Sequence, residues 1–166
     1  MDLTFPQISN DELNSFTLGV GRAIQNYGVI ESLINKLIEV IIKDSLIQHH
    51  IIKQAASKRI EILEGFVKRD GGSIDGNGIK LTTLFNDTRD ALKNRNKLAH
   101  NPFVIEEKRA GVASSNVWGI NVIRYSQGKN SEEWIDVSEL NIIISESCDL
   151  IARFNQLLEH YDPITE

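Results

Sequence analysis

The sequence is poor in the residues that mark disulfide-rich, fibrous or membrane proteins. Its single cysteine, Cys148, allows no disulfide within the chain and suits a reducing compartment. Three prolines and 11 glycines are too few for a disordered or collagen-like chain. The apolar segments are interrupted by charges such as Glu31 and Lys36, so we predict no membrane span. Residues 1–4 show no basic segment followed by an apolar run, and we therefore expect a cytoplasmic protein.

The composition fits one globular domain over residues 1–166. Hydrophobic residues make up 41% of the chain and charged residues 25%, which supports a real core but not two domains. The net charge of −5 argues against nucleic-acid binding over the whole surface, because such binding depends on neutralising phosphates. A local basic patch is compatible with this balance.

The first predicted helix has the most regular apolar pattern in the chain. Ser9 and Glu12 have the spacing of a capping box, which predicts a helix start. Apolar residues then recur at alternating steps of four and three: Phe16, Val20, Ala23, Tyr27, Ile30, Ile34, Leu37 and Ile41. This seam predicts either an intrachain core or a dimer interface. Gly19, Gly21 and Gly28 weaken the helix, and suit either the close approach of another helix or a kink.

A second helix is predicted over about residues 51–67. Its apolar stripe consists of Ile52, Ala56, Ile60, Leu63 and Val67. His49 and His50 lie at the join before it, where a helix end favours cationic side chains. No cysteine or carboxylate lies at ligand spacing from this pair, so we predict no metal and no cofactor. Residues 68–78 are rich in Gly and Asp and predict a loop, and residues 1–9 predict a lead that packs on the body.

A third helix is predicted over about residues 79–100. It should end there because Pro102 disfavours the helical conformation at Asn101. Its core-facing stripe is predicted to contain Leu81, Leu84, Phe85, Thr88, Leu92 and Ala99. Arg95 falls inside this stripe, where an unpaired charge is costly to bury. The acidic Glu31 interrupts an apolar line on the first helix, and it is either solvated at the rim or the partner of Arg95.

After the third predicted helix, the sequence pattern changes from helical to strand-like. β-branched and aromatic runs near residues 103–106, 117–125 and 134–137 predict an antiparallel hairpin or meander, inserted over about 102–137. Ser138 is predicted to cap a last helix that runs to about His160, with Cys148 as a small core residue. The predicted fold class is mainly α, a four- to five-helix up-and-down bundle with a small antiparallel β insert before the last helix.

The candidate functional residues lie at the end of the third helix. Arg95, Asn96 and His100 fall within a turn and a half, and Arg89, Lys93, Asn96 and His100 form one polar ridge, with Lys97 close by. An arginine suits a phosphate and a histidine suits proton transfer, as metal-independent cleavage of a phosphodiester requires. The two are five residues apart, about 140° around an ideal helix, so we expect convergence only if the last turn unwinds or two chains share the site. Alternatively, Arg95 bonds Glu31 and His100 only ends the helix near its negative pole.

The stretch Arg95-Asn96-Lys97-Leu98-Ala99-His100 resembles the motif of the HEPN superfamily, named for domains found in higher eukaryotes and prokaryotes. That motif is an arginine, a polar residue, three or more variable residues and a histidine. Residues 92–103 are similar to the form in small bacterial and phage members, and residues 27–31 are similar to the first helix of such proteins, where an acidic residue is common.

The resemblance implies a homodimeric bundle in which two Arg-x4-His motifs line one cleft. It implies metal-independent endoribonuclease activity, often in toxins held by a cognate antitoxin or in phage defence. In that reading Arg95 holds the phosphate, His100 acts at the 2′-OH or the leaving oxygen, and Asn96 orients one of them. Many members are instead non-catalytic modules that dimerise or bind RNA or a protein partner, and this is the alternative reading.

Overall fold

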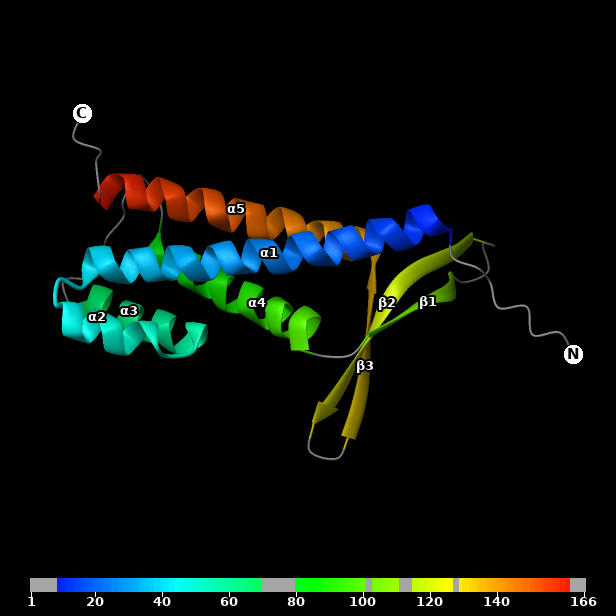
Figure 1. Cartoon of the computed structure of the whole chain (residues 1–166), viewed down its shortest axis with the longest axis horizontal. Helices are drawn as coiled ribbons and strands as arrows, with labels where there is room; N and C mark the ends of the chain where they lie inside the picture. The colour runs from blue at the N-terminus through cyan, green and yellow to red at the C-terminus, as the bar shows by residue number, and fades with distance from the viewer. Residues whose placement is uncertain (1–8, 70–79, 101–102, 111–114, 127–128, 162–166) are drawn as a thin grey trace, which may run out of the picture.

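The computed structural model describes residues 9–69, 80–100, 103–110, 115–126 and 129–161, and within the sheet the side chains of 119–123 and 133–136. Its elements are α1 (Asn10–Ile41), α2 (Ser45–Ile52), α3 (Ala56–Arg69), α4 (Leu81–His100), β1 (Phe103–Ala110), β2 (Ser115–Ser126), β3 (Lys129–Asp136) and α5 (Val137–Tyr161) (Figure 1). The predicted mainly α bundle with a small antiparallel sheet before the last helix is confirmed. The predicted packing of residues 1–8, most of the 68–78 loop and the Asn101–Pro102 boundary lie outside the described residues.

The predicted capping box starts α1, the central helix of the bundle. The Ser9 hydroxyl accepts a hydrogen bond from the Glu12 backbone N–H at 3.2 Å, and the Glu12 carboxylate accepts one from the Ser9 N–H. The apolar seam is buried within the single chain, with only its last member, Ile41, partly exposed. The seam is therefore intrachain core rather than a dimer interface.

The close packing of α1 on α5 explains one glycine of α1. A Cβ at Gly19 would lie 2.7 Å from Leu140 Cδ2, so a larger residue there would require the Leu140 side chain to move. Beside it, Asn26 donates a hydrogen bond to the Ser147 hydroxyl at 2.9 Å and contacts Cys148 Sγ at 3.3 Å. Cys148 is exposed, so its predicted place in the core was wrong.

The predicted second helix is two helices in the structure. Helix α2 already begins at Ser45, capped by Asp44, and ends at Ile52, so His49 and His50 lie in its last turn. Helix α3 begins at Ala56. The reason is geometric: Ile51 and Ile60 are both buried but nine residues apart, which is about 180° around a helix. One straight helix cannot bury both, so the chain turns between them.

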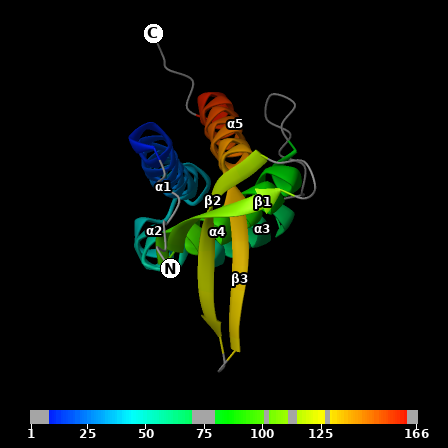
Figure 2. The ribbon, with the colours of Figure 1, turned by 90° about the vertical axis from the view of Figure 1, so that its right-hand side faces the viewer.

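The sheet is the predicted meander. Strand β2 lies between β1 and β3 and pairs antiparallel with both. Ser126 of β2 pairs with Lys129 of β3, and the β2–β3 hairpin extends away from the helices (Figures 1 and 2). Ile120, Val122 and Ile135 anchor the sheet in the core.

Two predictions about the ends of α4 and α5 were wrong. Helix α5 is capped by Asp136, whose carboxylate accepts the Glu139 N–H at 2.8 Å, and not by Ser138. Ala99 is exposed, whereas Lys97 and Leu98 are buried. The reason is that near its C-terminal end α4 meets β3, where Lys97 pairs with Glu133, so the buried side of the helix rotates away from its earlier stripe.

Candidate functional site

Arg95 and His100 lie in contact at the C-terminal end of α4. Arg95 Nη1 is 2.6 Å from His100 Nε2, and α4 remains helical through His100. The expectation that convergence needs an unwound turn or a second chain was wrong. Helical side chains lean toward the N-terminus, so His100 leans back over the preceding turn and the long Arg95 side chain reaches it.

This contact suits one tautomer of the imidazole. A guanidinium can only donate hydrogen bonds, so Nε2 of His100 accepts this bond in the tautomer that carries its proton on Nδ1. The same Arg95 Nη1 also donates to the Asn96 side-chain oxygen at 3.1 Å. His100 and Asn96 are exposed, so a ligand can reach the ring from solvent.

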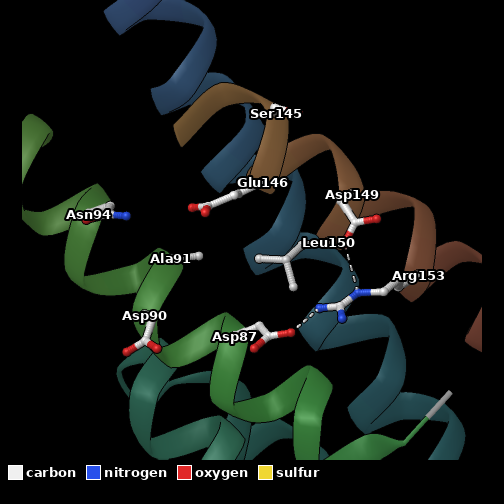
Figure 3. Close-up of a pocket in the computed structure, with 9 residues that line it drawn as sticks. All are labelled: Asp87, Asp90, Ala91, Asn94, Ser145, Glu146, Asp149, Leu150 and Arg153. Carbon is white, nitrogen blue, oxygen red and sulfur yellow. Dashed lines mark hydrogen bonds and ion pairs between the residues drawn. The ribbon is translucent and has the colours of Figure 1, made fainter. Parts of the chain in front are cut away.

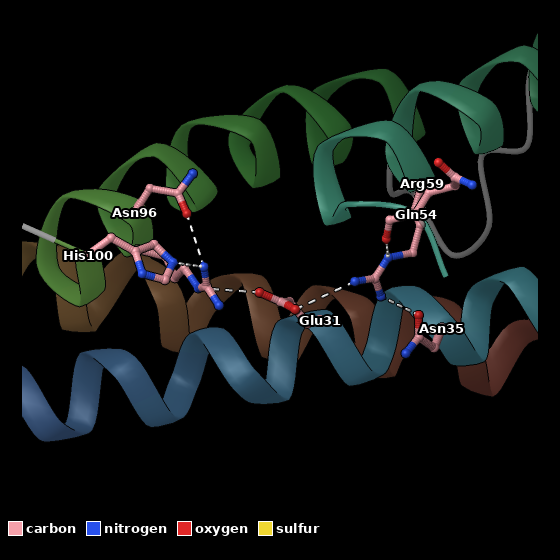
Figure 4. A network of polar contacts seen from close by, with 7 residues as sticks. Glu31, Asn35, Gln54, Arg59, Asn96 and His100 are labelled. Carbon is pink, nitrogen blue, oxygen red and sulfur yellow. Dashed lines mark hydrogen bonds and ion pairs between the residues drawn. The ribbon is translucent and has the colours of Figure 1, made fainter. Parts of the chain in front are cut away.

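Glu31 of α1 pairs with Arg95, the second of the two alternatives the sequence left open for this carboxylate. Its Oε1 lies 3.4 Å from Arg95 Nε, while its Oε2 lies 3.6 Å from Nη2 of Arg59 in α3 (Figure 4). Glu31 is therefore shared by two arginines. The three charged groups sum to +1, so the site keeps a net positive charge beside the His100 ring.

Arg59 was missed by the sequence reasoning. It donates to the Gln54 carbonyl oxygen at 3.0 Å and to the Asn35 side chain, and its side chain is only 10% exposed. The Arg95 side chain is 32% exposed. Arg59 is thus the more buried arginine of this network, with several polar partners, whereas Arg95 is partly exposed to solvent. The signal in the sequence was the position of Arg59 directly beside Ile60, on the border of the apolar stripe.

The remaining basic residues near the motif are paired with carboxylates. Arg89 bonds Glu64 of α3, and hydrogen bonds from Arg89 and then Lys68 lower the pKa of Glu64. Lys93 contacts Asp90 at 2.7 Å, with both side chains largely exposed. Lys97 is buried against Glu133 of β3. The ridge predicted from Arg89 to His100 is therefore locally neutralised, except at its Arg95–His100 end.

A separate groove lies between α4 and α5. It encloses about 580 Å³ and is lined by Asp87, Asp90, Ala91, Asn94, Ser145, Glu146, Asp149, Leu150 and Arg153 (Figure 3). Four of these are carboxylates, against one arginine that already contacts Asp87 at 2.7 Å. By helical spacing the groove is on the side of α4 away from Asn96 and His100. Its charge disfavours phosphates, so it forms no part of a nucleic-acid site.

Among the described residues, no three His, Cys, Asp or Glu side chains are placed to hold a metal ion. No helix in the described part of the chain has the length and apolar content needed to cross a membrane. Comparison of the chain with protein-family models, curated proteins and solved structures finds no match.

Proposed function

We propose that the protein is a metal-independent endoribonuclease of HEPN type, with Arg95 and His100 as its catalytic pair. The observation that carries this proposal is the 2.6 Å contact between an exposed histidine and an arginine that remains partly exposed. A general base and a cation side by side are what RNA self-cleavage chemistry needs. The motif resemblance supports the same assignment.

The chemistry follows from the two groups. The 2′-oxygen of RNA attacks the adjacent phosphorus, the P–O5′ bond breaks, and the products carry a 2′,3′-cyclic phosphate and a 5′-OH. His100 Nε2 accepts the 2′-OH proton once an incoming phosphate draws the Arg95 guanidinium away from the ring, and the departing O5′ takes up a proton from solvent water to become the 5′-OH. Arg95 then neutralises the charge that develops on the phosphate oxygens. Asn96 holds the guanidinium in place through its side-chain oxygen.

The test is incubation of a structured RNA with the protein in EDTA. Wild type should cleave it and leave 2′,3′-cyclic phosphate ends, while DNA of the same sequence should stay intact because it lacks the 2′-OH. His100→Ala should lower the rate by about 10²-fold or more. Lys93→Ala is the matched control, because Lys93 is a cation on the same helix whose exposed ion pair adds little. No cleavage by wild type, or equal cleavage by His100→Ala, contradicts the proposal.

A second candidate is a non-catalytic module of the same fold. It is favoured by the observation that the cations flanking the motif, Arg89, Lys93 and Lys97, each contact a carboxylate, which leaves little charge to attract RNA. In this case wild type binds a protein partner and cleaves no RNA. If instead the nuclease acts as a toxin, expression alone should arrest growth, His100→Ala should relieve the arrest, and a cognate antitoxin would be the expected partner.

A further inference from the structure

Arg59 is fixed in place by neutral partners as well as by Glu31. Its side chain is 10% exposed, and it donates to the Gln54 carbonyl oxygen at 3.0 Å and to the Asn35 side-chain oxygen. Among the described residues, Glu31 is the one carboxylate in contact with this guanidinium, through Oε2 at 3.6 Å from Nη2. Because its hydrogen bonds come from groups outside the candidate site, Arg59 keeps its position when Arg95 moves.

Arg95 is held more loosely by the same carboxylate. Its side chain is 32% exposed, and its Nε lies 3.4 Å from Oε1 of Glu31, which is longer than a strong hydrogen bond. Its other contacts are with the exposed side chains of Asn96 and His100. A movement of Arg95 toward a ligand therefore breaks one long ion pair and two solvent-accessible contacts.

The cost of that movement depends on what remains beside Glu31. The Glu31 side chain is 27% exposed, so its carboxylate is largely withdrawn from water, and an unpaired charge there is destabilising. Its two oxygens are turned toward different arginines, as Figure 4 shows. When Arg95 leaves Oε1, Arg59 remains at Oε2, and the negative charge keeps a partner.

We propose that Arg59 is a positioning residue that makes Arg95 available to an RNA phosphate by keeping Glu31 paired, an inference that rests on the proposed function. If Arg95 were the sole partner of Glu31, phosphate binding would first have to leave a semi-buried carboxylate alone. With two arginines on one carboxylate, Arg95 instead exchanges a shared anion for an unshared one. The net charge of +1 over the three groups matches the single negative charge of a phosphodiester.

Two simpler roles for Arg59 lead to different results. A cation that attracts RNA only through its field would do so whether or not Glu31 is ionised. A residue that only stabilises the fold would act on unfolding and leave the competition for Glu31 unchanged. The proposal requires instead that the effect of Arg59 on RNA binding depends on the charge of Glu31.

A double-mutant cycle on RNA binding tests this dependence. The probe is RNA with 2′-fluorine in place of every 2′-OH, which keeps the phosphates but lacks the nucleophile. Arg59→Gln should weaken its binding by about fivefold or more in the wild-type background, and by about twofold or less in the Glu31→Gln background, where no carboxylate holds Arg95. Equal losses in the two backgrounds, or a wild type that does not bind this RNA, overturn the proposal.

Two further variants separate the charge of Arg59 from other effects. Arg59→Lys keeps a cation beside Glu31 and should restore most of the affinity, and binding as weak as that of Arg59→Gln contradicts the proposal. Lys58→Gln is the matched control, because it removes the neighbouring cation of the same helix, whose exposed partner is Glu61 at 2.8 Å. Its affinity should stay within about twofold of wild type.

Urea unfolding without RNA tests the sharing of Glu31 directly. Arg95→Ala should lower the folding equilibrium constant by about fivefold more in the Arg59→Gln background than in wild type, because only there does Glu31 lose its last partner. Equal reductions overturn the proposal.

If Arg59→Gln does not fold, Glu31→Gln alone decides. This variant frees Arg95 and should bind the 2′-fluoro RNA at least as tightly as wild type, whereas weaker binding overturns the proposal. None of these measurements uses cleavage. A protein that binds RNA with the predicted coupling but never cleaves it contradicts the nuclease proposal alone, and a nuclease without the coupling contradicts this inference alone.

Discussion

At the scale of single residues, the network around Glu31 joins two arginines that differ in burial. Glu31 lies between Arg59, which is nearly buried with three partners, and Arg95, which is partly exposed. Removing one partner of a buried ion pair is far costlier than removing an exposed one, because the remaining charge stays desolvated. The two arginines should therefore respond differently to the same truncation.

We predict that Arg59→Ala lowers the free energy of unfolding by about 3 kcal/mol, while Arg95→Ala lowers it by about 1 kcal/mol or less. Urea unfolding at equal protein concentration measures both. Lys58→Ala, which removes an exposed ion pair with Glu61, serves as a baseline. Equal losses for the two arginines would assign Arg95 the structural role and would favour the non-catalytic module.

A second prediction concerns Glu64, whose pKa is lowered by hydrogen bonds from Arg89 and then Lys68. A carboxyl with a lowered folded-state pKa stabilises the fold above its unfolded pKa of about 4.3, and this contribution is lost as pH falls through the folded value. Glu64→Gln should therefore cost about 1 kcal/mol or less at pH 7, because the pair is partly exposed, and this cost should shrink as pH falls below about 4.3. Thermal unfolding of both proteins at pH 7 and at acidic pH checks it, and a difference that does not shrink on acidification contradicts the ionic origin.

At the scale of elements, the sheet depends on one glycine. A Cβ at Gly119 would lie 2.4 Å from the Trp134 ring and 2.7 Å from the Ile135 carbonyl oxygen, and the backbone atom cannot move aside cheaply. We predict that Gly119→Ala destabilises the protein by about 1–3 kcal/mol. Gly65→Ala, on an open helical position, should instead stabilise it by about 0.5–1 kcal/mol. Denaturant unfolding shows whether each substitution lowers or raises the free energy of unfolding. A Gly119→Ala variant as stable as wild type would show that Trp134 can leave its position.

The elements predictable from sequence are those with a long, unbroken period. The capping box and the apolar seam predicted α1. The low helical preference of the residue before Pro102 predicted that α4 ends at His100. The α2–α3 break was not predicted, because Ile52 to Val67 fit one stripe and only the burial of Ile51 reveals the change of direction. The burial of Lys97 and the exposure of Ala99 were not predicted either, since both depend on where β3 packs.

The contacts of the candidate site can likewise be divided into those predictable from the sequence and those that were not. The Arg95–Glu31 pair was predictable, because a guanidinium on an apolar stripe needs a carboxylate. The Arg95–His100 contact was not, because helical wheels place Cβ atoms and ignore the reach and lean of long side chains. Arg59 belongs to a network through Asn35 and Gln54, and its position beside Ile60 indicates a partly buried side chain but does not identify these partners.

At the scale of the whole molecule, the question is whether the proposed catalytic unit needs one chain or two. The resemblance implies a cleft lined by two motifs, but the structure already joins Arg95 to His100 within one chain at 2.6 Å. A paired molecule would then carry two complete units side by side, rather than one unit divided between subunits. Mixed dimers distinguish these arrangements.

We predict that co-expressed Arg95→Ala and His100→Ala chains, isolated as mixed dimers by two different tags, stay as inactive on RNA as either variant alone. In such a dimer no chain keeps both residues, so an intrachain site cannot be rebuilt. If Arg95 of one chain worked with His100 of the other, one of the two sites would be intact and about half of the wild-type rate would return. Mixed dimers of wild type with the double variant are the control and should keep that half, because one chain remains complete. Activity recovered in the first mixture would mean that the 2.6 Å contact is a resting arrangement that the working dimer replaces.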